Sequence, residues 1–300
     1  MSSRLKLAFF IHELLPVGGV GTWFYYVLPD LQKYHDVTLF YNKADVKQLE
    51  RLNEKSVITK KLIDRPSTVF DVLFRGYDKD PDIDAKHCVH TLHACVSECD
   101  FLFNIHGRVD SFLAVSEEAR DSFKEVYPKE KRPIYVVPNY VPSRAIPPTK
   151  RFDDKIKMVM ASRLTPEKGL RHLFNMVKML DERHINYQID LFTIFQKMPH
   201  LDNGKVKFHL PRLDIDFSQY HYLIQLSDSE AYCYTVHEAL SAGTAVIVKG
   251  LPVFKDVVRH GYNGYIYPNL DNINEVPVRF NYKPTGSIDI WLNYLKKVIQ

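Results

Sequence analysis

Two carboxylates, Glu230 and Glu238, stand eight positions apart in the chain. The local pattern predicts that Glu238 lies on a helix and Glu230 in the loop before it, with the backbone N–H groups of the helix N-terminus between them. Those N–H groups and the helix dipole favour an anion. A carboxylate on each side of an anion site suits a ligand with hydroxyl groups beside phosphates. The alternative is an ordinary cap and a surface acid.

Two cations follow an apolar segment at 156–161. Arg163 and Lys168 come directly after it, and Pro166 between them is placed to open a helix. Both cations therefore leave the carboxyl end of a predicted parallel strand, where open α/β sheets bind ligands. An arginine fork and a lysine point charge can neutralise a diphosphate without a metal. The alternative is that both are solvated surface cations.

Apolar strands alternating with helical segments must position these residues. In the first half we predict strands at 5–11, 36–41, 87–93, 111–115 and 134–137, and helices at 22–33 and 116–126. In the second half we predict strands at 156–161, 188–194, 206–210, 223–226 and 244–248, and helices at 167–182, 235–242, 253–259 and 288–299. Such alternation is typical of parallel sheets covered by helices on both faces.

A proline-rich segment separates the two halves of the chain. Four prolines fall within eleven residues, and proline supports neither a helix interior nor a central strand: Pro138, Pro142, Pro147 and Pro148. We interpret 140–152 as a linker. The predicted domains are an N-terminal one at 1–145 and a C-terminal one at 150–286. A terminal helix at 287–300 is expected to pack back on the first.

The composition narrows the function classes. The 300 residues are 45% hydrophobic and 25% charged, which excludes a disordered chain. The net charge of +4 arises without a basic arm in either half, so nucleic acid binding is not supported. No apolar run approaches the roughly 20 residues that cross a bilayer, and no export signal is evident. We expect a cytoplasmic protein whose four cysteines are thiols.

Taken together, the motifs resemble those of a known family. Arg-Leu-x-Pro-x-Lys-Gly at 163–169, Glu-x7-Glu at 230–238, Ala-Gly-Thr-Ala-Val at 242–246 and His-Gly-Tyr-Asn-Gly at 260–264 occur in this order. They resemble the second domain of the family 4 retaining glycosyltransferases. The likeness covers about 156–268, with looser matches at 18–21, 91–93, 114–116 and 137–139. It implies the GT-B fold, two Rossmann-like domains with parallel sheets facing a cleft.

The resemblance also implies roles for individual residues. Arg163 and Lys168 would hold the donor diphosphate and stabilise its charge as the bond to the sugar breaks. Glu238 would accept hydrogen bonds from the ribose hydroxyls, and Glu230 would contact the donor sugar. Backbone amides around two more residues would reach phosphate and sugar: Tyr234 and Thr235.

Three first-domain residues complete the implied site. Gly18 and Gly19 would let their loop approach the donor closely, because glycine has no side chain to hinder it. His93 would lie near the reacting centre and contact the donor sugar. The family needs no divalent metal and no cofactor beyond the donor itself, which is most often a UDP-sugar.

The predicted function is therefore a retaining glycosyltransferase that moves a sugar from a nucleotide diphosphate to a hydroxyl acceptor. Acceptors of this kind include a growing glycan, a lipid-linked saccharide and a cell-surface polymer. One alternative is a catalytically impaired relative that binds a sugar nucleotide or supports a partner enzyme, because Ala231 and Cys233 replace two family glycines. A third is a sugar-nucleotide epimerase of the same fold.

Three other features suggest different functions. Histidines and cysteines between 87 and 99 could suggest zinc, but on a strand His87 and His93 share one face, whereas Cys88 and His90 share the other. Such ligands do not close one tetrahedral site. The glycines at 18–21 lack the full Gly-x-Gly-x-x-Gly of a dinucleotide site. A basic stretch is either a solvated face or a peripheral membrane contact: Lys47, Arg51, Lys55, Lys60 and Lys61.

Overall fold

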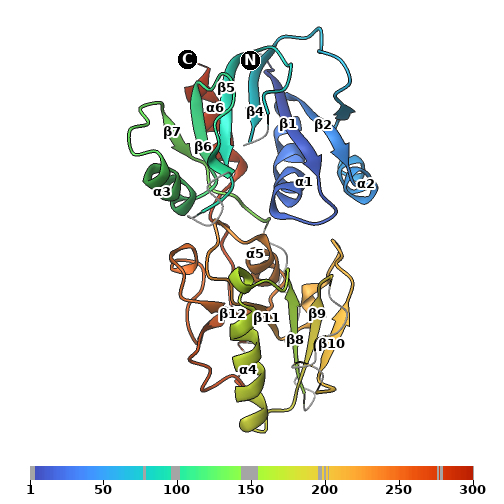
Figure 1. Cartoon of the computed structure of the whole chain (residues 1–300), viewed down its shortest axis with the longest axis vertical. Coiled ribbons are helices and arrows are strands. Elements are labelled where there is room, and N and C mark those ends of the chain that lie inside the picture. The colour runs from blue at the N-terminus through green and yellow to red at the C-terminus, as the bar shows by residue number, and fades with distance from the viewer. Residues whose placement is uncertain are drawn as a thin grey trace. The chain divides into compact units, whose positions relative to one another are not determined.

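The computed structural model describes residues 4–76, 79–95, 102–142, 155–194, 198, 201, 203–275, 277 and 280–299. The chain forms two compact units. Met1–Tyr140 and Thr285–Gln300 make the first unit, and Val141–Pro284 make the second. The chain therefore crosses between the units twice. Its last helix, α6 (Ile288–Val298), lies among the elements of the first unit (Figure 1).

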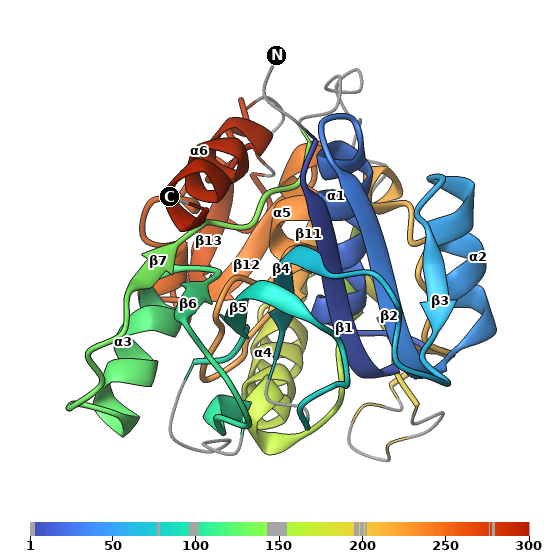
Figure 2. The ribbon, with the colours of Figure 1, turned by 90° about the horizontal axis from the view of Figure 1, so that it is seen from above.

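A seven-stranded sheet forms the centre of the first unit, in the order β3-β2-β1-β4-β5-β6-β7. Each neighbouring pair is parallel, and Figure 2 shows the row of strands from β3 to β7. The strands are β1 (Lys6–Leu14), β2 (Asp36–Ala44), β3 (Thr59–Lys61), β4 (Phe70–Arg75), β5 (Ala85–Leu92), β6 (Ser111–Ala114) and β7 (Ile134–Val136). The other helices are α1 (Gly19–Gln32), α2 (Val46–Glu54) and α3 (Glu117–Val126).

Aromatic rings form much of the core of the first unit. Phe9 of β1 stacks on Phe74 of β4 with 4.6 Å between ring centroids. Trp291 of α6 is fully buried, 5.7 Å from Phe74 and 5.8 Å from Trp23 of α1. Burying such large rings contributes strongly to stability. The C-terminal helix therefore completes the core of the first unit, although the second unit lies before it in the sequence.

The second unit has a six-stranded parallel sheet in the order β10-β9-β8-β11-β12-β13. Its strands are β8 (Ile156–Ala161), β9 (Tyr187–Phe192), β10 (Val206–His209), β11 (Tyr222–Gln225), β12 (Ala245–Lys249) and β13 (Gly264–Tyr267). Its helices are α4 (Leu170–Glu182) and α5 (Tyr234–Ser241), with 3-10 turns η2 (Pro166–Lys168), η4 (Phe217–Gln219) and η5 (Pro252–Phe254). The fold class is thus the predicted pair of parallel-sheet α/β units.

The structure corrects several predicted elements. The helix predicted at 253–259 is only the turn η5, because the Asn263 side chain bonds the N–H of Arg259 and the carbonyl of Val257. The helix predicted at 167–182 is divided at Gly169, which has φ 82°. The sequence analysis did not predict strands β3, β4 and β13. Of the linker predicted at 140–152, the part from 143 to 152 lies outside the described residues.

Candidate active site

In the second unit, the connections that follow the two central strands, β8 and β11, lead toward opposite edges of the sheet. α4 leads from β8 to β9, and α5 leads from β11 to β12, while β8 and β11 are neighbours in the sheet. Ligands of open α/β sheets bind at such a switch point, outside the carboxyl ends of the strands. The segments that follow these two strands carry Arg163, Lys168 and Glu230.

Lys168 and Glu230 contact each other at this edge. The Lys168 Nζ atom lies 2.7 Å from Glu230 Oε1, and the two side chains are only 21% and 12% exposed. Gln225, the last residue of β11, donates from Nε2 to the same carboxylate oxygen at 3.0 Å and to Ser227 Oγ at 2.7 Å. The sequence analysis missed Gln225, although a polar residue at the end of an apolar strand was a signal.

Gly169 lets the Lys168 turn approach the end of β11. A Cβ atom at this position would lie 2.1 Å from the carbonyl oxygen of Leu226, and the φ of 82° also favours glycine. The N–H of Asp228 donates to the carbonyl of Glu167 at 2.9 Å. Backbone contacts therefore hold the turn after β8 against the loop after β11.

Arg163 lies farther out than Lys168. Its side chain is 68% exposed, and its Nη2 atom is 3.6 Å from Glu167 Oε1. The Thr165 hydroxyl donates to that same oxygen at 2.7 Å and lowers the pKa of Glu167. An exposed ion pair of this length is weak. Because a guanidinium carries five N–H donors, this pair leaves donors for a ligand.

The N-terminus of α5 contributes backbone donors beside Glu230. Cys233 precedes the helix with φ 67° and makes no side-chain cap, and the first turn holds no acidic residue. The first N–H groups of a helix lack intrahelical acceptors, so this end suits an anion. Burial, with a contribution from Glu230, raises the pKa of the Cys233 thiol to about 12. Tyr234 is buried, whereas Thr235 and Glu238 are partly buried.

The first unit holds the other three predicted residues. Gly18 caps α1 and Gly19 begins it, and no atom lies within 4 Å of a Cβ added at either glycine. His93 follows β5 by one residue, with its ring edge-on to Trp23 at 4.6 Å between centroids. Burial lowers the pKa of His93 to about 4, so its ring is neutral at pH 7.

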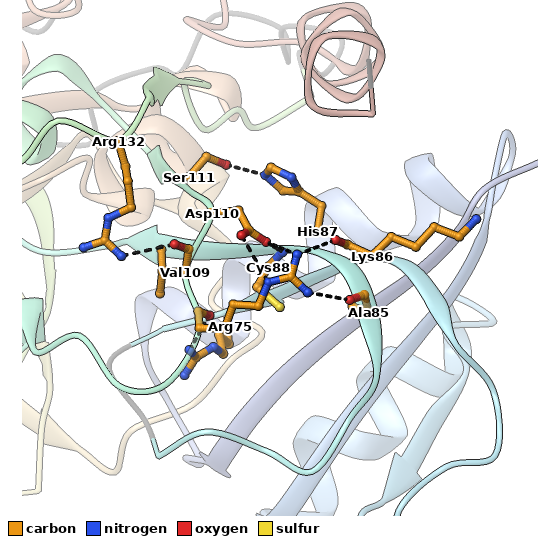
Figure 3. Close-up of polar contacts among 10 residues, drawn as sticks. Arg75, Ala85, Lys86, His87, Cys88, Val109, Asp110, Ser111 and Arg132 are labelled. Carbon is orange, nitrogen blue, oxygen red and sulfur yellow. Dashed lines mark hydrogen bonds and ion pairs between the residues drawn. The ribbon is translucent and has the colours of Figure 1, made fainter.

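The nearby histidines and cysteines serve the sheet of the first unit. Figure 3 shows His87 directed toward Ser111 of the next strand, with 2.8 Å between Nε2 and Oγ. Asp110 accepts from the N–H of Cys88 at 2.8 Å. Among the described residues no group of three or more side chains could hold a metal, and Cys99 lies outside them. The contacts of His87 and Cys88 thus join β5 to β6 and to the residue before it.

His90 is fully buried beside Arg75, its partner in the pairing of β4 with β5. Burial, and then Arg75, lowers the pKa of His90 to about 3. His90 is a core residue, but in the described part of the chain neither ring nitrogen has a hydrogen-bond partner. Its ring instead packs against Phe112.

A pocket of about 480 Å³ lies beside the turn η2, and no predicted site residue lines it. It is lined by Pro166, Arg171, His172, Asn175 and Asp228. Lys249 and His172 both pair with the Asp228 carboxylate. These contacts join the loop after β11 to α4 and to the end of β12.

Comparison with known proteins agrees with this geometry. Residues 143–276 match the family model of the glycosyl transferases group 1. This range contains the four charged residues that the sequence analysis singled out: Arg163, Lys168, Glu230 and Glu238. A comparison with curated protein sequences finds no significant match.

Solved structures share the fold over most of the chain. HepE from Anabaena, in complex with UDP and glucose, has a TM-score of 0.63 at 14% identity, over 88% of this chain and 85% of that one. A glycosyltransferase from Rickettsia africae has a TM-score of 0.60 at 13% identity, over 88% and 84%. Sucrose-phosphate synthase from Thermosynechococcus elongatus has 0.62 at 11%, over 99% and 90%. The fold is GT-B.

The basic stretch lies on α2 and β3. Arg51 lies over the Tyr25 ring at 3.7 Å and Lys55 at 5.3 Å, and all four lysines of the stretch are exposed. No helix among the described residues combines the length and apolar character that crossing a bilayer requires.

Proposed function

We propose that this chain is a retaining glycosyltransferase that uses a nucleotide diphosphate sugar, with a UDP-sugar as the first choice. The observation that carries the proposal is the arrangement of Lys168, Glu230 and the α5 N-terminus at the carboxyl ends of β8 and β11. The family match over 143–276 and the UDP-bound structures of the same fold support it.

Donor binding exchanges partners at the Lys168–Glu230 pair. The diphosphate offers Lys168 a stronger anion, and Arg163 adds a second cation from its exposed position. Glu230 then turns to the hydroxyls of the donor sugar, with Gln225 still bonded to the carboxylate. Glu238 accepts from the ribose hydroxyls, and the amides near Tyr234 and Thr235 meet the phosphates.

In the transfer step the bond between the anomeric carbon and the diphosphate oxygen breaks. The acceptor oxygen bonds to that carbon on the same face, and its proton passes to the departing diphosphate. Arg163 and Lys168 stabilise the negative charge that develops on this leaving group. Gly18 and Gly19 leave room for close approach, and the neutral His93 hydrogen-bonds the donor sugar.

Two cations make a divalent metal unnecessary in this proposal. Turnover should therefore be the same with a chelator as with added magnesium or manganese. Activity that disappears in chelator and returns with either metal would contradict this part.

The direct test is nucleotide binding by calorimetry and thermal shift, with UDP, GDP, ADP and UDP-sugars as ligands. UDP should bind and raise the melting temperature, and Glu238→Ala should weaken that binding. Glu182→Ala, which removes an exposed carboxylate from α4, is the matched control and should leave binding unchanged. A folded parent protein that binds no nucleotide would contradict the proposal.

A second candidate is a relative that binds the donor but transfers nothing. It is favoured by Cys233, which holds a left-handed conformation where the family has glycine. Incubation with UDP-sugars distinguishes the two candidates, because only the enzyme hydrolyses or transfers the donor. If the chain is the enzyme, Lys168→Met should abolish that activity.

Peripheral membrane contact through the basic stretch is the remaining part of the proposal, since several family acceptors carry lipid. Cosedimentation with anionic vesicles should fall when Lys47 and Lys60 are replaced by Glu. Binding that is the same for neutral vesicles would contradict it.

A further inference from the structure

The turn that leads into α5 contains a strained residue. Cys233 has φ 67° and ψ 80°, a left-handed conformation that is strained for a residue with a side chain. Such a conformation persists only where the surrounding structure holds it. Because Cys233 directly precedes the anion-binding end of α5, whatever holds this turn also positions the backbone donors.

An aromatic stack packs against this turn. The ring of His237, on α5, lies face to face on Tyr232, with 3.9 Å between centroids and 4° between planes. Tyr234 meets the same Tyr232 ring edge-on at 4.9 Å. Tyr232 and Tyr234, the residues on either side of Cys233, therefore both take part in these ring contacts. His237 and Tyr232 are 1% and 5% exposed, so neither ring has room to move freely.

Tyr282 fixes the orientation of the stack. Its hydroxyl lies 2.7 Å from His237 Nδ1, and its ring is edge-on to the imidazole. Burial lowers the pKa of His237 to about 3, so the ring is neutral and this contact is an uncharged hydrogen bond. The bond restrains rotation of the imidazole, and hence the ring of Tyr232 that stacks on it.

Both ends of the second unit are bonded to the same helix. Tyr282 lies just before the chain leaves this unit, and Pro142 lies just after the chain enters it. Ser241, four residues after His237, donates from its hydroxyl to the Pro142 carbonyl at 2.7 Å. Residues i and i+4 share a helix face, so one face of α5 makes both bonds.

We propose that Tyr232, His237 and Tyr282 are positioning residues of the donor site: they hold the left-handed turn at Cys233, and through it the N-terminus of α5, in the conformation that binds a nucleoside diphosphate. The inference rests on the proposed function, since the ligand is the nucleotide. None of the three residues needs to touch that ligand.

A double-mutant cycle tests this role, with UDP affinity measured by calorimetry and stability by thermal melting. Tyr282→Phe keeps the ring and removes only the hydroxyl, and it should weaken UDP binding about tenfold. Cys233→Gly removes the cost of the left-handed turn. In that background Tyr282→Phe should weaken binding less than threefold, because the turn no longer depends on the stack.

Tyr222→Phe is the matched control. Tyr222 is another buried tyrosine of the second unit, whose hydroxyl donates to the Ile273 carbonyl at 2.9 Å. Its loss should lower the melting temperature and leave UDP affinity unchanged. If Tyr282→Phe fails to fold, His237→Gln replaces it in the cycle with the same expected rescue by Cys233→Gly.

Several outcomes would overturn the inference. They are unchanged UDP affinity in Tyr282→Phe, an equal loss with and without Cys233→Gly, and an equal loss in the Tyr222→Phe control. In each case the parent protein still binds UDP, so the proposed function stands. A folded parent protein that binds no nucleotide would overturn both.

Discussion

Lys168 pairs with Glu230 at 2.7 Å in the structure. In the proposed complex the diphosphate replaces that contact. Lys168→Met removes a charge-assisted bond from a partly buried site and should weaken UDP binding by about 1.5–3 kcal/mol, or roughly 10- to 150-fold. Lys178→Met, an exposed lysine on α4, is the control. Equal affinities in calorimetry would contradict the assignment of Lys168.

His93 and His90 lie three residues apart at the end of β5, and we predict a role in turnover for the first and a role in stability for the second. His93 lies past the end of β5, whereas His90 is fully buried within it. His93→Ala should lower turnover at least about tenfold, or roughly 1.4 kcal/mol, with little change in UDP affinity. His90→Ala should lower the melting temperature more than turnover. The reverse result in steady-state kinetics would exclude His93 as the residue that contacts the sugar.

Among the elements, the turn from η2 into α4 depends on Gly169. Gly169→Ala places a Cβ 2.1 Å from the Leu226 carbonyl and forces a left-handed alanine. Gly204→Ala is the matched control, because Gly204 has φ 75° and open space around it. Gly169→Ala should lower the melting temperature more than the control, and should also weaken UDP binding because Lys168 shifts. Similar effects in both variants would show that the contact with β11 is unimportant.

The apolar strand β8 could be predicted from the sequence, whereas strand β4, which carries two charged residues, could not. Strand β8 was predicted with its observed bounds because five of its six residues are apolar and four are buried. Strand β4 was missed because Asp71 and Arg75 interrupt its pattern. Their partners are remote: Asp71 accepts from the N–H of Lys6, and Arg75 donates to the carbonyl of Arg108.

The same limit applies to the candidate site. Motif spacing predicted that Arg163, Lys168 and Glu230 follow strands of the second unit. It did not predict that Lys168 bonds Glu230, because that contact depends on β8 and β11 being neighbours across a crossover. Nor did it predict Tyr282, which reaches α5 from 45 residues away in the sequence.

At the scale of the whole molecule, full or partial burial lowers the pKa of histidines in both units. Among the described residues, burial lowers the pKa of four histidines in the first unit: His35, His87, His90 and His93. In the second unit it lowers the pKa of His237. Each of these groups binds a proton more readily when unfolded, at a pKa near 6.5, than when folded. Their stabilising effect is therefore present above pH 6.5 and falls as the pH is lowered, toward 4 for His93 and toward 3 for His90 and His237.

Acid should consequently destabilise the first unit before the second. Each buried histidine contributes a slope of at most about 1.4 kcal/mol per pH unit, and less where the ring is partly exposed. Carboxylates with lowered pKa values, such as Glu130 at about 2, lose their contribution only at lower pH. Between pH 6.5 and 4.5, hydrogen exchange should therefore accelerate in β5 more than in β11, after correction for intrinsic exchange. His90→Leu should reduce that difference because it removes one proton-binding site. Acceleration that begins in β11, or is equal in both strands, would show that these histidines do not set the acid response.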